Sequence, residues 1–388
     1  MRNDLITPFS LPCGPVDESL FDTVICTSAT GTLGLFLEVH GKRIEAGDGL
    51  QAFLSGWLGK PPSPQRARAG WSMAFGLAGL ALKDGRVDPA EIAVRVAVAL
   101  TETGHDGNWS ASFKPAPLIF DGRAMRDVVR AEATQSGSDG ATLKLVDASG
   151  TAYAFERIGG AWMAAAVPRM HTVAPFGRAH LVPNYALPVG GGSDFFRECH
   201  TVGSIDDDAI ATFRGGFEAL HAAAPEYRAW VDRALNGIVV GALQPAFKTV
   251  SGSWEEVPGY VHSSYPHAPV VIAELLVHEC SHQYYYMLER LGPIDDGTDT
   301  ELYWSPPIRK ARPINRVLMA YHALANTLLF FNRIKQTGYD DRGYVDANEQ
   351  FLREDIETLA RPLRDNPALT EFGRGLFQPL DERITEFA

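Results

Sequence analysis

Two histidines four residues apart, His278 and His282, are the residues of this sequence whose types and spacing point most directly to chemistry. On an α-helix, side chains at positions i and i+4 lie on one face, so both imidazoles can bind one metal ion. Glu279 follows the first histidine and can reach a ligand or water on that ion. The alternative is a surface helix with two ordinary histidines, but the apolar run before the motif favours a buried, rigid site. The pattern therefore predicts a metal centre on a helix from about Pro269 to Leu291.

The third metal ligand is the next question that the sequence poses. The residues after His282 contain no further His-x-x-Gly-x-x-His extension, and no Asp or Glu occurs between Leu302 and Tyr339. The following helix, predicted from about Ile314 to Gln336, therefore cannot donate a carboxylate. It carries His322 in the middle of an apolar face, which predicts His322 as the third ligand. A hydrogen-bonded core histidine is the competing interpretation, because histidine is often partly buried.

The same stretch without acids is rich in cations, which suggests a site for an anion beside the metal. Arginine suits this task because its planar guanidinium can hold a carboxylate through two hydrogen bonds. A solvated basic loop is the alternative for any one of these residues. The candidates for binding an anionic ligand are Arg309, Arg312 and Arg316.

Helices and a small sheet are expected to position these residues. The first hundred residues read as mostly helical, with a helix opened by Asp88 and Pro89. Alternating residues and glycine turns predict an antiparallel meander over about 141–167. Gly and Pro predict a connection from Pro175 to Ser193, and helices are then expected from Asp206 to about Gly241, broken at Pro225. An amphipathic tail helix is predicted to begin near Asn348.

Composition sets limits on the class of protein. The chain has 388 residues, of which 45% are hydrophobic, enough for a sizeable core in two domains or in one large elaborated domain. With 35 basic and 47 acidic residues, the net charge is 35 − 47 = −12, which argues against general nucleic-acid binding. The four cysteines form no metal-binding or disulfide pattern, and neither a signal peptide nor a membrane span is evident. We expect a cytoplasmic, non-membrane protein with an N-terminal region over 1–170 and a metal-binding catalytic domain over 171–388.

The motif and the residues after it resemble the HExxH-motif peptide modification family, whose members occur beside genes for ribosomally made peptide natural products. The resemblance runs from roughly His171 to Phe331 and is strongest from Ala273 to Leu324. Two local departures are Pro307-Ile308, where the family usually has a Trp, and Met319-Ala320, where a polar-Gly pair is common. The segments that carry the resemblance are Ser253 to Tyr265, Glu274-Leu-Leu-Val-His-Glu-Cys-Ser-His282, Tyr303-Trp-Ser-Pro306, Arg309, Arg312-Pro313 and Val317-Leu318.

The resemblance implies an oxidoreductase, a dioxygenase that uses Fe(II) and 2-oxoglutarate to hydroxylate a peptide side chain. The implied partner is a peptide, with a leader-containing precursor as one such substrate. Three neutral imidazoles leave the charge of the iron uncompensated, which favours a dianionic cosubstrate, and Arg309 or Arg312 could hold its distal carboxylate. Glu279 would then orient a ligand or water. We expect an α+β, predominantly helical fold with a zincin-like core around the HExxH helix and the small meander in the middle of the chain.

Two other functions remain open from the sequence. A zinc metallopeptidase would use Glu279 as general base, with zinc lowering the pKa of its bound water to about 7. Such an enzyme also needs an oxyanion stabiliser, and Tyr303, Tyr321 or Tyr284 could serve. A module that only grips a leader peptide is the third class, and the intact motif argues against it.

Overall fold

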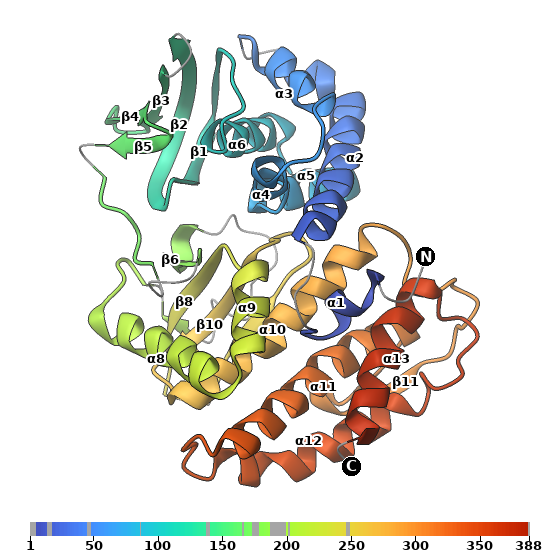
Figure 1. The fold of residues 1–388 in the computed structure, drawn as a ribbon. Coiled ribbons are helices and arrows are strands. Elements are labelled where there is room, and N and C mark those ends of the chain that lie inside the picture. Colours follow the sequence, from blue (N-terminus) through green and yellow to red (C-terminus); the bar gives the residue numbers. More distant parts are fainter. Residues whose placement is uncertain are drawn as a thin grey trace.

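The computed structural model describes residues 5–13, 18–44, 48–85, 87–136, 140–164, 167–172, 178–186, 199–200, 202–245 and 249–386. Helices and two larger sheets occupy largely separate stretches of these residues, consistent with the expected α+β class (Figure 1). The elements of the first part are α1 Thr7–Ser10, α2 Glu18–Ile44, α3 Leu50–Leu58, α4 Pro64–Gly70, α5 Met73–Lys83, α6 Pro89–Glu102, β1 Trp109–Phe120, β2 Arg123–Ser136, β3 Gly140–Asp147, β4 Ala152–Ile158 and β5 Ala161–Ala164.

The remaining elements build the part of the molecule that carries the histidine motif. They are β6 His180–Pro183, the 3₁₀ helix η2 Asn184–Ala186, β7 Cys199–His200, α8 Asp207–Ala223, α9 Pro225–Ala234, β8 Gly237–Leu243, β9 Ser251–Ser253, β10 Tyr260–Tyr265, α10 Pro269–Glu289, β11 Tyr303–Ser305, the 3₁₀ helix η3 Pro306–Ile308, β12 Lys310–Arg312, α11 Ile314–Thr337, α12 Tyr344–Ala360 and α13 Glu371–Glu386.

The first sheet is an antiparallel meander in the order β1-β2-β3-β4-β5. Its last three strands confirm the meander predicted over about 141–167. The two long strands β1 and β2 were not predicted from the sequence, and they extend the sheet to five strands. Helices α2 to α6 lie beside this sheet in the upper half of Figure 1. The helix α6 begins as predicted, because the side chain of Asp88 accepts a hydrogen bond from the amide of Ala90 at 3.1 Å.

The second sheet has the order β6-β8-β10-β9, with β7 paired to β8. Strands β6, β8 and β10 run parallel, and β9 pairs antiparallel with β10. The predicted helical continuation to Gly241 is wrong, since the chain turns at Leu235 and forms β8. The run Ile238-Val239-Val240 is fully buried, and β-branched residues favour a strand in such a position. In the predicted connection Pro175–Ser193, residues 175–177 and 187–193 lie outside the described residues, and β6 and η2 occupy 180–186.

Two hydrophobic cores underlie the two halves of Figure 1. One lies between the meander and helices α2 to α6, and the other gathers around α10 and α11. The chain does not divide cleanly between them, because Ile6, Phe9, Phe21 and Val24 belong to the second core. The N-terminal segment thus packs against the elements that carry the histidine motif.

Among the described residues, α2 alone is long and apolar enough to cross a membrane by length and composition. This criterion is weak, because core helices of proteins that never enter a membrane also meet it. Phe21, Leu33 and Phe36 of α2 are buried inside the protein, while 33% of the apolar window of this helix is buried in all.

Candidate functional site

Helix α10 carries the histidine pair on its half-buried face. The rings of His278 and His282 lie one turn apart, with their centroids 4.9 Å from each other and their planes at 86°. The helix begins at Pro269, which is favoured at a first helical position because its missing N–H needs no partner there. The two histidines therefore lie on one face of a helix, as the sequence predicts.

Burial is the main reason why the pKa of His282 lies well below its ordinary value, and the nearby His278, His322, Arg312 and Arg316 lower it further. The imidazole is thus neutral at pH 7, which is the form that binds metals. Its Nδ1 atom is buried and has no hydrogen-bond partner among the described residues. A buried acceptor without a partner is costly, so this atom is a candidate for a missing ligand.

Glu279 is the third residue of the motif to be placed, and its side chain points to the second sheet. It is 4% exposed. Its Oε1 atom accepts a hydrogen bond from the hydroxyl of Ser251 at 2.8 Å, while its Oε2 atom has no partner in the described part of the chain. Ser251 belongs to β9, the last strand in the order of the sheet, so Glu279 connects the helix to that strand. The sequence contained no signal that would have selected Ser251.

Arg312 and Arg316 lie close enough to His282 to lower its pKa, which places both guanidinium groups near the histidine pair. Burial, followed by the neighbouring Arg316, lowers the pKa of Arg312 from its ordinary value. Within the described part of the chain, neither arginine has a carboxylate within 4.0 Å. Glu289 lies within electrostatic reach of Arg316, but it forms no ion pair with it. We call Arg312 and Arg316 the basic pair.

Arg309 is placed differently from the basic pair. It follows the short 3₁₀ helix η3, has a positive φ of 51°, and is exposed. It is not among the charges that lower the pKa of His282. Of the three arginines predicted to bind an anion, the structure therefore brings two to the histidine pair and leaves Arg309 on the surface.

His322 lies fully buried on α11 and is engaged by the N-terminal segment. Its Nε2 atom donates toward the carbonyl oxygens of Ser10 at 2.8 Å and Phe9 at 3.1 Å. Burial lowers the pKa of His322 to about 4, so the ring is neutral at pH 7. Its Nδ1 atom has no hydrogen-bond partner among the described residues. That atom is the one left over for a metal, since ligating histidines commonly donate their other nitrogen to a carbonyl.

His322 lies close enough to His282 to lower its pKa, but it packs against aromatic residues of the core. The ring packs edge-on against Trp230, with centroids 6.4 Å apart, and Trp230 stacks on Tyr284 of α10 at 4.2 Å. Tyr284 is fully buried, so these rings mark the core side of α10, away from its half-buried face. Throughout the described residues, no three His, Cys, Asp or Glu side chains form a group that could hold a metal ion. The geometry thus gives two candidate ligands on α10 and no support for His322 as a third.

The residues therefore fit a metal ion in part. Two neutral imidazoles on one helix face are ligands that iron and zinc both accept. The two imidazoles suit such an ion, but the described residues bring no third protein ligand to them.

Glu274 and Tyr344 also border this face, and Tyr344 was not considered from the sequence. Glu274 lies one turn before His278, and the hydroxyl of Tyr344 donates a hydrogen bond to its carboxylate. Burial raises the pKa of Glu274, while Tyr344 and His278 act against this rise. The i−4 spacing of Glu274 from His278 was a signal available in the sequence, whereas the contact with Tyr344 was not.

We expect that His322→Ala lowers stability and leaves metal content unchanged. The substitution removes the donor to two buried carbonyls and opens space in the core, which costs about 1–3 kcal/mol of unfolding free energy. Chemical denaturation and metal analysis of the same sample measure the two effects. His171→Ala is the control, because His171 is exposed. Loss of metal at unchanged stability would instead establish His322 as a ligand.

The same variant has a pH signature. The folded pKa of His322 is about 4 and the ordinary value is 6.5, so the unfolded chain binds more protons between these values. Stability of the wild type therefore falls as pH drops through this window, and His322 contributes up to about 1.4 kcal/mol per pH unit to that slope. His322→Ala is expected to have a shallower slope than His171→Ala when both are denatured at pH 4 to 7.

Comparison with known proteins does not assign this chain to a family. A scan against protein families gives no match, and a search of curated proteins gives no significant match.

Proposed function

We propose that this protein is an Fe(II)- and 2-oxoglutarate-dependent hydroxylase of a peptide side chain, acting on a ribosomally made peptide. The observation that carries the proposal is the basic pair beside the histidines, two guanidinium groups that lack a carboxylate partner within 4.0 Å among the described residues. The resemblance of the segment around the motif to peptide modification proteins supports the same function.

In this proposal His278 and His282 hold the metal, and the remaining positions belong to the cosubstrate, dioxygen and a third ligand that the described residues do not bring to the pair. The bound ion supplies the oxygen and one-electron chemistry that no side chain can provide. The task of the protein is to bind and orient the cosubstrate. Arg312 and Arg316 do so by pairing with its far carboxylate, since a buried, isolated carboxylate is costly.

Glu279 acts in the proposal as a positioning residue. The hydroxyl of Ser251 fixes one of its carboxylate oxygens, which leaves the other free to accept a hydrogen bond from a ligand or water near the histidines. The HExxH helix, the mixed sheet and the antiparallel end strand β9 would together form the zincin-like core. A peptide substrate could pair with the outer edge of β9, since strand addition is a common way to bind extended peptides.

A zinc metallopeptidase is the second candidate, and one observation favours it. Glu279 is buried beside the histidine pair with an unpartnered Oε2 atom, as a general base for a metal-bound water would need. Against it, this function does not use the basic pair, and a peptidase site gains little from two cations without anions.

The experiment that separates the two functions begins with anaerobic purification and metal analysis of the full chain. The enzyme is then reconstituted with Fe(II) or with Zn(II), and the conversion of 2-oxoglutarate to succinate is measured under air. Succinate formation with iron alone supports the hydroxylase. Absence of succinate, together with zinc-dependent cleavage of a casein digest, would replace it with the peptidase.

A further inference from the structure

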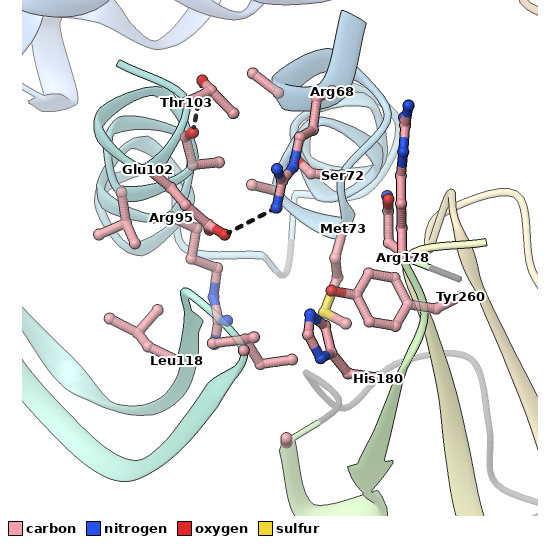
Figure 2. A pocket seen from close by; sticks show the side chains of 18 residues that line it. Arg68, Ser72, Met73, Arg95, Glu102, Thr103, Leu118, Arg178, His180 and Tyr260 are labelled. Carbon is pink, nitrogen blue, oxygen red and sulfur yellow. Dashed lines mark hydrogen bonds and ion pairs between the residues drawn. The ribbon is translucent and has the colours of Figure 1, made fainter. Parts of the chain in front are cut away.

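A cavity lies between the two halves of the molecule, away from the residues discussed above. Helices α4 and α6 border it on one side and strands β6 and β10 on the other (Figure 2). It encloses about 100 Å³, and no residue of the histidine pair or the basic pair lines it. This volume corresponds to roughly three water molecules, the size of the head group of a small organic ligand.

One wall of the cavity contains an arginine whose ion pair is long and partly exposed to solvent. Arg68 on α4 lies 3.9 Å from Glu102 on α6, and their side chains are 57% and 22% exposed. Figure 2 shows the guanidinium group of Arg68 and the carboxylate of Glu102 facing each other, with His180 and Tyr260 across the cavity. An ion pair at this distance and exposure contributes little stability, so Arg68 can change partner at low cost.

Two buried polar atoms in the lining have no partner among the described residues. They are the hydroxyl oxygen of Ser72 and the Nδ1 atom of His180. Ser72 is the N-cap of α5, but its side chain makes no capping hydrogen bond. Buried polar groups are normally satisfied, so both atoms indicate a ligand in the cavity.

Part of the lining is apolar and offers a surface for an apolar tail of the ligand. Met73, Val98, Leu118 and Ile119 contribute this surface. The backbone next to Tyr260 is fixed, because the side chain of Gln283 accepts from the amide of Gly259 at 2.9 Å and donates to the carbonyl of Tyr260 at 3.2 Å. A charged head and a short apolar tail would match the two kinds of surface.

We propose that this cavity binds a small organic carboxylate, whose head group replaces Glu102 on Arg68 and accepts a hydrogen bond from Ser72 or Tyr260. The tail lies against the apolar wall. This site is independent of the proposed hydroxylase site, because the two share no residue.

Binding at this site takes up a proton. Burial raises the pKa of Glu102 to about 7, Arg68 lowers it, and Asp121 in the turn between β1 and β2 raises it. Four other ionisable groups line the cavity: Tyr260, His180, Arg95 and Arg178. Burial raises the pKa of Tyr260 and lowers that of His180. Arg95 is paired with Glu91 at 2.9 Å. A ligand carboxylate adds a negative charge beside Glu102 and favours its protonated form. Affinity therefore falls as pH rises above about 7.

Calorimetry of the full chain with butyrate tests the proposal, with uncharged butyramide and inorganic phosphate as comparison ligands. Butyrate is expected to bind about fivefold more tightly at pH 7 than at pH 8, and butyramide should not bind. Arg68→Gln should weaken butyrate binding by about tenfold or more, since a charge-assisted hydrogen bond is lost. Glu102→Gln should retain binding and remove its pH dependence. Arg130→Gln is the control, because Arg130 is similarly exposed at 56% and is also ion-paired.

Three results overturn the proposal: no binding of butyrate, equal binding of butyramide, or unchanged affinity in Arg68→Gln. Tighter binding of phosphate than of butyrate overturns the carboxylate assignment in favour of an inorganic anion. His278→Ala is expected to bind butyrate like the wild type. Loss of binding in that variant would mean that butyrate occupies the histidine site and would overturn the assignment to this cavity.

Discussion

Replacing either His278 or His282 by alanine is expected to remove metal binding and activity together. Each histidine supplies one of only two ligands that the described part of α10 brings onto one face, so the remaining imidazole cannot hold the ion alone. We expect at least a hundredfold loss of metal affinity. Replacing a residue that only supports a metal ligand already costs about 10- to 100-fold, and removing the ligand itself should cost more. Metal content after reconstitution with Fe(II) or Zn(II), followed by removal of excess metal, measures this loss.

Stability distinguishes loss of a ligand from loss of the fold. His278 and His282 are half-buried at the surface of α10, so their removal should change the unfolding free energy of the metal-free protein by less than about 1 kcal/mol. His171→Ala provides the matched control for both measurements. Retention of stoichiometric metal in the double variant His278→Ala/His282→Ala would exclude the pair as ligands and end the metal-centre interpretation.

The local part of the fold could be predicted from the sequence. The helix at His278 and His282, the helix that follows it and the meander over β3 to β5 all have regular spacing or turn residues, which act over a few positions. Strand β8 was missed because an apolar run after a helix is equally compatible with more helix. The strand conformation of this segment depends on pairing with β6 and β10, which are distant in the sequence.

The candidate site shows the same division between local and distant information. Spacing on one helix placed His278 and His282 together, and the basic pair was expected because both arginines lie beside the start of the next helix, α11. His322 could not be placed in this way, because its partners Phe9 and Ser10 lie more than three hundred residues away in the chain. An apolar helix face containing one histidine fits a core residue as well as a ligand, and only tertiary packing distinguishes the two.

Replacing Arg312 or Arg316 by lysine is expected to weaken 2-oxoglutarate binding by about tenfold or more while metal content stays constant. The charge is preserved in each variant, so a change in affinity reports the planar, two-pronged geometry of the guanidinium. Calorimetry against the metal-loaded protein measures the affinity, and metal analysis of the same sample excludes an indirect loss.

Arg309→Lys is the matched control for this experiment, because Arg309 lies in the same loop but is exposed and does not act on His282. Its affinity for 2-oxoglutarate should equal that of the wild type. An effect at Arg309 alone would move the anion site from the basic pair to the surface of the loop. If the wild type binds no 2-oxoglutarate, or if neither Arg312→Lys nor Arg316→Lys changes its affinity, the cosubstrate assignment fails. The free carboxylate oxygen of Glu279 then makes zinc-dependent hydrolysis the function to pursue, because that reaction needs a base beside the metal and no second anion.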